Sequence, residues 1–223
     1  MRSLAIALVL FTATSARADE KSSSDDQTEW GLGVKVRRSF APKPVQKLFV
    51  DDTPGYAYDD GAGFDFAKRN KDLEVVFGFG YDRLDGVDGY YLEKGGDPLE
   101  PGKVTYVHFD HLRWYTAEFT VIDHLKLHKF LEFRYGAGLG IGLVQGQVLE
   151  TDALCVGSDL QSDCIMDPAG AKQNQPADIP PVLPVINVLV GFQLEPTRWL
   201  HIHLDGGIHT APYVSLGATL YLW

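Results

Sequence analysis

Apolar and polar residues alternate along this chain in runs of about ten residues. In the run 200–209, one parity comprises Leu200, Ile202, Leu204 and Ile208, and the other comprises His201, His203, Asp205 and His209. Successive side chains of a β-strand point to opposite faces of the sheet, so each run predicts a two-faced strand. In a soluble sandwich the apolar face lies in a core. In a transmembrane barrel it contacts lipid, and the polar face lines the lumen.

Eight such runs are present, and apart from the longer fourth they are about as long as a tilted strand must be to cross the hydrocarbon layer. They lie at about 30–40, 58–68, 73–84, 104–122, 130–143, 182–195, 200–209 and 213–222. Near His111 and Leu112 the alternation is interrupted, which predicts a β-bulge in the fourth strand or an extension of this strand beyond the membrane.

The connections between the runs alternate in length. Three on one side are long, at 41–57, 85–103 and 144–181, and the fourth is short, at 210–212. Those on the other side are all short, at 69–72, 123–129 and 196–198. Bacterial outer-membrane barrels combine longer extracellular loops with short periplasmic turns. The pattern therefore predicts an all-β fold, an eight-stranded antiparallel up-and-down transmembrane β-barrel in the cell outer membrane.

The N-terminal segment has the three parts of an export signal. Arg2 supplies a positive start, residues 4–11 are apolar, and Ala16-Arg17-Ala18 is a small-x-small cleavage site. Residues 19–29 are polar and without period, as in a flexible terminus. We therefore expect a signal peptide at 1–18, a flexible periplasmic tail at 19–29 and an outer-membrane β-barrel at 30–223.

Cys155 and Cys164 are the only two cysteines, and both lie in the longest connection. An even number of closely spaced cysteines in an exported chain predicts a disulfide bond. We expect this bond to restrain an extracellular loop.

Composition excludes further classes of binding partner. The formal net charge is −10, and no cluster of lysine and arginine occurs, so we expect no nucleic-acid partner. No motif predicts a cofactor. The glycines at 136, 138, 140 and 142 have a strict spacing of two, unlike a phosphate-binding loop. We interpret them as small inward residues that leave room for larger side chains across a narrow lumen.

The inward faces of the predicted strands carry charges of both signs. An eight-stranded barrel is only wide enough for side chains to fill it, and buried charges must be paired. We therefore predict a lumen closed by ion pairs and hydrogen bonds. The expected members of this lumen polar network are Glu74, Asp82, Glu132, Arg134, His201, His203, Asp205 and His209.

Three alternatives compete with this interpretation. Alternating histidines and a carboxylate on 200–209 suit zinc or copper, but a polar lumen explains them equally well, and we predict no metal site. A lipid-modifying enzyme would need serine, histidine and acid together; Thr210 follows His209, no His-x-Ser pair occurs, and we predict no enzyme. A soluble periplasmic lipocalin-like barrel would turn its apolar faces inward, which would leave the glycine row at 136–142 as a solvent face.

Both ends of the predicted barrel have a distinctive sequence. The first strand begins Trp30-Gly31-Leu32-Gly33-Val34, and the chain ends Gly217-Ala218-Thr219-Leu220-Tyr221-Leu222-Trp223. With the export signal, these segments resemble the small eight-stranded outer-membrane β-barrel superfamily, which includes the OmpX-like and OmpW-like proteins. The resemblance implies a non-enzymatic integral protein that is structural, binds through its surface loops, or forms a narrow porin-like conduit for solutes. It also implies contact with outer-membrane lipid and lipopolysaccharide, and recognition of the C-terminal strand ending at Trp223 by the barrel-assembly machinery.

Overall fold

The computed structural model describes residues 28–41, 46–47 and 50–222. The predicted signal peptide, most of the predicted periplasmic tail and Trp223 lie outside these residues. The first strand begins at Thr28, two residues before the predicted start of the barrel.

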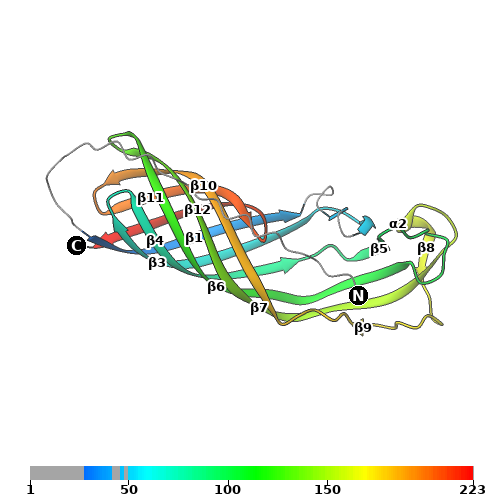
Figure 1. Ribbon diagram of the computed structural model, residues 1–223. Helices are drawn as coiled ribbons and strands as arrows, with labels where there is room; N and C mark the ends of the chain where they lie inside the picture. The colour runs from blue at the N-terminus through cyan, green and yellow to red at the C-terminus, as the bar shows by residue number, and fades with distance from the viewer. Residues whose placement is uncertain (1–27, 42–45, 48–49, 223) are drawn as a thin grey trace, which may run out of the picture.

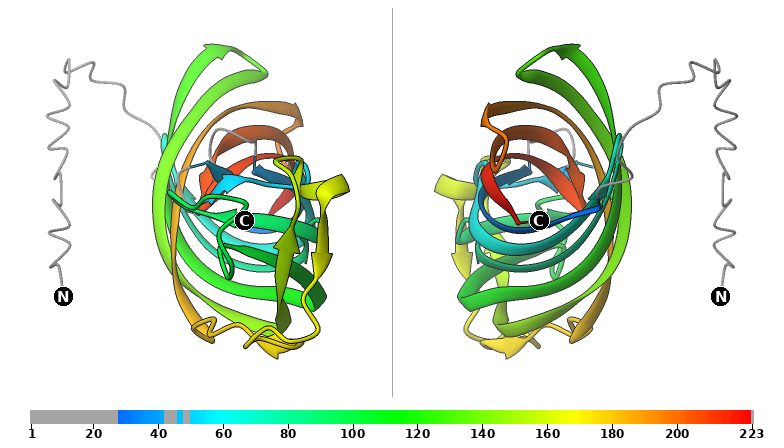
Figure 2. Two further views of the ribbon diagram at one scale, coloured as in Figure 1. Left: turned by 90° about the vertical axis from the view of Figure 1, so that its right-hand side faces the viewer. Right: turned by 90° about the vertical axis from the view of Figure 1, so that its left-hand side faces the viewer.

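Eight long strands pair with their neighbours in an antiparallel ring (Figures 1 and 2). They are β1 (Thr28–Ala41), β3 (Ala57–Asn70), β4 (Leu73–Asp85), β6 (Val104–His128), β7 (Leu131–Cys155), β10 (Val182–Thr197), β11 (Leu200–His209) and β12 (Ala211–Leu222). Strand β12 returns to β1, and β6 pairs with both β4 and β7, so the sequence of pairings has no end. The predicted eight-stranded antiparallel barrel is confirmed. No helix in the described part of the chain is long and apolar enough to cross a membrane.

The barrel is apolar on the outside and polar on the inside. On β12, Val214 and Leu216 are 50% and 53% exposed, whereas Ser215 and Thr219 are 6% and 4% exposed. The same alternation holds on the other barrel strands, where the exposed parity is rich in Leu, Ile, Val and Phe. A soluble β-barrel has the opposite arrangement. Turning the apolar parity outward rules out the lipocalin-like alternative for this chain.

Short turns connect the strands at the end of the barrel where β12 finishes (Figure 1). The predicted turn at 123–129 is wrong, because β6 continues to His128 and the turn itself is at 129–130. The charged and histidine residues of this segment suggested a turn. They instead extend the alternation, with Leu125 exposed on the outer face and His124 buried inside.

The predicted β-bulge lies in the middle of β6. The register with β7 shifts between Asp110 and Arg113, and His111 has a φ of 51°. The facing residue is Gly146, with a φ of 107°. A Cβ at this glycine would lie 2.5 Å from the carbonyl oxygen of His111, so the close approach of the two strands requires glycine here.

The two longest predicted loops contain regular structure, so their assignment as irregular connections is wrong. Beyond the bulge, β6 and β7 continue as a paired ribbon, which adds β2 (Val50–Asp52), β5 (Gly89–Glu93), β8 (Cys164–Met166), β9 (Gln175–Pro176) and the short helix α2 (Leu160–Asp163). We call residues 50–57, 86–110 and 147–181 the extension. It projects from the barrel end opposite the C-terminus (Figure 1). From Val104 to Asp110 the ribbon is about 20 Å long at the usual rise of a strand.

Candidate functional site: the barrel interior and the extension

The structure places all eight residues of the predicted lumen polar network inside the barrel. Their exposed fractions lie between 1% and 6%: Glu74, Asp82, Glu132, Arg134, His201, His203, Asp205 and His209. Their partners, however, are mostly residues that the sequence interpretation did not include. They form several groups along the barrel axis.

The largest group lies toward the end with the short turns. The guanidinium of Arg69 donates to both carboxylate oxygens of Glu132, at 2.9 and 2.7 Å. Glu132 also lies 3.0 Å from Nδ1 of His124, whose Nε2 lies 2.7 Å from Glu74. The hydroxyl of Tyr221 donates to the other oxygen of Glu74 at 2.8 Å. This group thus joins β3, β4, β6, β7 and β12 through charged hydrogen bonds, which are stronger than neutral ones.

Arg134 and His203 of β11 lie in the wall of the central cavity of the lumen. Nε of Arg134 lies 3.4 Å from Asp205, and Asp205 lies 2.9 Å from Nδ1 of His203. The side chain of Gln193 lies between Arg134, at 3.4 Å, and Nδ1 of His201, at 3.1 Å.

A third group is centred on Glu118 of β6. Lys35 donates to Glu118 at 3.2 Å and also lies 3.0 Å from Asp65. Asn187 donates to the second carboxylate oxygen of Glu118 at 3.1 Å, and Nε2 of His209 lies 3.3 Å from the same oxygen.

Asp82 is separate from the other predicted residues. It accepts two hydrogen bonds from the guanidinium of Arg37, one of them from Nε at 3.1 Å. Arg37 comes from β1, and β3 lies between β1 and β4. Gly61 of β3 lets the two side chains meet, because a Cβ there would lie 2.0 Å from a carboxylate oxygen of Asp82.

Three important residues were missing from the sequence interpretation: Arg69, His124 and Glu118. Glu118 lies on the inward parity of its strand, between the outward Ala117 and Phe119, so strict alternation could have found it. Arg69 and His124 were assigned to turns because polar residues near a strand end give the same signal as a turn. The structure extends both strands far enough to bury them.

The three histidines of β11 do not gather around one point. His203 is near Asp205, His201 is near Gln193, and His209 is near Glu118. Within residues 28–41, 46–47 and 50–222, no group of three His, Cys, Asp or Glu side chains could hold a metal ion.

The remaining space in the lumen is small. A central cavity leaves about 30 Å³ for the centres of water molecules, and its walls include Lys35, Arg134 and His203. A single water needs roughly 10–15 Å³ on this measure. This cavity therefore has room for a few water molecules between the ionic groups and for no larger solute.

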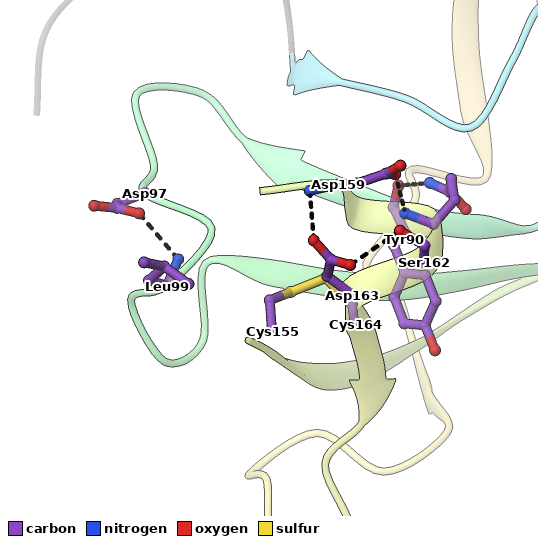
Figure 3. The surroundings of a disulfide bond; sticks show 9 residues. Tyr90, Asp97, Leu99, Cys155, Asp159, Ser162, Asp163 and Cys164 are labelled. Carbon is purple, nitrogen blue, oxygen red and sulfur yellow. Dashed lines mark hydrogen bonds between the residues drawn. A yellow bond between two sulfur atoms is a disulfide. The ribbon is translucent and has the colours of Figure 1, made fainter. Parts of the chain in front are cut away.

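The extension has a small core of its own. Leu92, Val104, Ala153, Leu160 and Cys164 pack together and are at most 8% exposed. The predicted disulfide between Cys155 and Cys164 links the paired strands β7 and β8 next to this core (Figure 3).

Helix α2 completes the extension beside the disulfide. Asp159 caps the helix by accepting from the backbone of Gln161 at 3.1 Å. Asp163 accepts from the backbone N–H of Asp159 at 3.2 Å and from the hydroxyl of Ser162 at 3.0 Å (Figure 3). The Gln161 side chain donates to the carbonyl of Tyr90 at 3.0 Å, so α2 is attached to β5.

Burial also changes the chemistry of a tyrosine in the extension. Tyr91 of β5 is about half buried and donates to the carbonyl of Val87 at 2.7 Å. Burial, with a smaller effect from the Asp88 carboxylate, raises the pKa of Tyr91 to about 12.

The charge of the protein is unevenly distributed. The extension contains thirteen acidic and three basic side chains, a formal net charge of −10 with histidine neutral. The whole chain also has a net charge of −10. The remaining residues are thus neutral together, or have a net charge of −2 without residues 1–18, which contain Arg2 and Arg17. Most of the acidity of this protein therefore lies in its extension.

Comparison with family models and with curated proteins finds no match. Among solved structures, Neisserial surface protein A is 10% identical with a TM-score of 0.47, covering 88% of this chain and 98% of its own. Ail, the attachment invasion locus protein of Yersinia pestis, is 11% identical with a TM-score of 0.43, covering 87% and 97%. The N-terminal β-barrel domain of Pseudomonas aeruginosa OprF is 11% identical with a TM-score of 0.40, covering 88% and 100%.

The geometry itself defines the class of protein. The strands form a ring, the outer face is apolar and the lumen is polar, which is the inverse of a soluble barrel. Every backbone group of a closed sheet can be satisfied inside a bilayer, so this arrangement is stable in lipid. The chain is an eight-stranded outer-membrane β-barrel protein that contacts membrane lipid through its outer face.

Proposed function

We propose that this protein is a non-enzymatic surface-binding module, and that its extension binds partners with a positively charged surface. The observation that carries the proposal is the concentration of a net charge of −10 on the extension. A surface of one sign attracts partners of the other sign and accelerates their association.

The structure of the extension suits this role. Leu154 and Ile165 are paired across β7 and β8 and are 39% and 66% exposed, and the neighbouring Val156 is 91% exposed. Exposed apolar side chains surrounded by charge are typical of an interaction surface, in which an apolar centre supplies affinity and a polar rim supplies specificity. The disulfide and the small core order this surface before a partner binds, which lowers the entropic cost of association.

A solute conduit is the second candidate, and the closed lumen argues against it. An enzyme is the third. His203 and Asp205 lie near Ser215 in the wall of the central cavity, but about 30 Å³ of free space gives an acyl substrate no access to them. For the second candidate, steady ion conductance of the purified barrel in planar bilayers would support a conduit over a binding module.

We also propose that the barrel-assembly machinery recognises the C-terminal strand. The support is the alternation on β12, where Leu216, Leu220 and Leu222 face outward. A variant in which Leu220→Asp and Leu222→Asp are combined should accumulate unassembled in the periplasm.

The binding proposal can be tested with the whole protein in nanodiscs, using immobilised polylysine and heparin as probes. The variant E100Q/D178N removes two exposed carboxylates from the extension, and E29Q/D72N removes two at the opposite end. We expect the first variant to bind polylysine more weakly, by about threefold to tenfold at low salt, and the second to bind as the wild type does. Preferential binding to heparin, or equal losses in both variants, would contradict the proposal.

A further inference from the structure

The end of the extension where β7 pairs with β8 has two different faces. The register places Leu154 opposite Ile165 and Cys155 opposite Cys164, and opposed side chains of a sheet point to the same side. Cys164 belongs to the core of the extension, together with Leu160 of α2. Because side chains alternate along a strand, Leu154 and Ile165 lie on the face that points away from this core.

The centre of this outer face is apolar. Val156 follows Leu154 on the same side of β7, and its backbone N–H donates to the carbonyl of Asp163 at 2.9 Å, so the pairing continues past the disulfide. Leu154, Val156 and Ile165 are 39%, 91% and 66% exposed. At the usual spacing of a sheet, the Cβ atoms of these three residues are about 5–8 Å apart.

Three aspartates border the apolar side chains on the same face. Asp163 lies opposite Val156, and the backbone N–H of Asp167 donates to the carbonyl of Asp152 at 2.8 Å, which continues the register of the two strands. The carboxylates accept hydrogen bonds from backbone N–H groups, at 3.0 Å for Asp152, 3.2 Å for Asp163 and 2.9 Å for Asp167. Neutral donors hold a carboxylate in place without cancelling its charge. We call the following residues the β7–β8 face: Asp152, Leu154, Val156, Asp163, Ile165 and Asp167.

The three basic side chains of the extension are paired with carboxylates outside this face. The pairs, at 2.9, 3.2 and 2.6 Å, are Lys94 with Asp51, Lys103 with Glu93, and Lys172 with Glu150. The negative charge of the β7–β8 face is therefore available to a binding partner. A partner that complements this face has apolar side chains flanked by positively charged ones.

We propose that the β7–β8 face binds a basic amphipathic helix of a partner. In such a helix, apolar residues at i, i+3 and i+4 form a stripe whose Cβ atoms are about 5–6 Å apart, which fits the spacing of Leu154, Val156 and Ile165. Lysines and arginines beside the stripe then lie next to the aspartates. A second copy of this chain fits less well, because its extension has the same excess of negative charge. A helix of this kind is one of the positively charged partners of the proposed function, on which this inference rests.

The test uses the whole protein in phosphatidylcholine nanodiscs, with empty nanodiscs as the blank. Two synthetic peptides made of the same leucines and lysines serve as probes. One has its leucines at the helical spacing i, i+3, i+4 and i+7, and the other has them spread around the helix. The variant V156S/I165S removes two apolar side chains from the β7–β8 face. The control Y56S/L99S removes two exposed apolar side chains elsewhere in the extension, and neither variant changes the net charge.

We expect the wild type to bind the amphipathic peptide at least about tenfold more tightly than the permuted one. V156S/I165S should abolish this preference, whereas Y56S/L99S should keep it within about twofold. Equal affinity of the wild type for the two peptides, or the same loss in both variants, would overturn the proposed helix site and leave the proposed function intact. Failure of both peptides to bind the wild type would refute the proposed function as well.

The wild type alone supplies a second measurement, which does not depend on the folding of a variant. In roughly 1 M salt the Debye length falls to about 3 Å, but the burial of apolar surface is not screened. The permuted peptide should then no longer bind, whereas the amphipathic peptide should bind more weakly but measurably. Loss of both peptides to the same extent would overturn the proposal. Self-association of the wild type that V156S/I165S abolishes would also overturn it, because the face would then belong to a second copy of this chain.

Discussion

Replacement of Arg69 by methionine should be among the most damaging single changes in the barrel. Arg69 is 5% exposed and donates two hydrogen bonds to Glu132 and a third, at 3.1 Å, to Glu195. Methionine retains much of the side-chain volume and removes the charge. Glu132, which is 1% exposed, would then keep only the weaker contacts with His124 and Gln193.

The magnitude follows from this burial. Removing one partner of a buried ion pair costs about 3–5 kcal/mol, because the other charge is left uncompensated. Arg38 provides a matched control. It makes the same two-pronged contact with Asp60, at 2.7 and 2.9 Å, but these side chains are 61% and 67% exposed. Exposed ion pairs contribute about 0–1 kcal/mol, so Arg38→Met should be nearly neutral.

The assay is urea unfolding in lipid vesicles at pH 7, followed by the fluorescence of the four tryptophans. The double variant R69M/E132Q should cost less than the sum of its single changes, since it removes both charges together, with a coupling energy of at least about 1.5 kcal/mol. Two results would refute the reasoning. One is a cost for Arg69→Met no larger than for Arg38→Met, and the other is strict additivity in the double variant.

Three further predictions concern other parts of the molecule. Val190→Arg, on the lipid-facing side of β10, should cost about 2–4 kcal/mol in vesicle unfolding. Gln147→Arg, which lies in the extension opposite Asp110, should cost less than about 1 kcal/mol. Gly217→Ala should cost about 1–3 kcal/mol in the same assay, because the new Cβ would lie 2.2 Å from the ring of His203; an unchanged unfolding midpoint would show that the ring can move away. The neutral form of Tyr91 should stabilise the extension below about pH 10, and this contribution should be lost as the pH rises through about 12. Ultraviolet titration of the wild type and of Tyr91→Phe should show that one tyrosine fewer ionises near pH 12 in the variant.

The sequence predicted the faces of the strands well because the side-chain period of a strand is two. Once Ile202 and Leu204 are assigned to lipid, His203 and Asp205 must point inward, and both are buried. The apolar parity of 30–40 and of 213–222 likewise identified the lipid-facing sides of β1 and β12, which pair with each other in the structure.

The pairing of the interior charges was harder to predict. Some interior contacts join neighbouring strands, as between Glu74 of β4 and His124 of β6, and others span intervening strands, as between Arg69 of β3 and Glu132 of β7. Side chains on adjacent strands lie about 5–8 Å apart at the Cβ atoms. Such contacts depend on register, which the alternating pattern of one strand does not contain. Arg69 and His124 were also missed, because polar residues are common both at strand ends and in turns.

The extension was predicted least well, for a related reason. It lies outside the apolar belt, so its strands have no lipid-facing parity and no strong alternation. Only Cys155 and Cys164 marked it as ordered, and their bond joins two strands that sequence alone did not reveal.

Charged side chains have different roles in the barrel and in the extension. Inside the barrel, opposite charges lie within hydrogen-bonding distance in a medium that salt reaches poorly, so they fix the strands relative to one another at any ionic strength. In the extension, the excess of carboxylates faces water, where its influence on an approaching partner falls as salt screens it. A partner that is attracted to the extension should therefore bind with strong salt dependence, while the stability of the barrel beneath it changes little over the same range of salt.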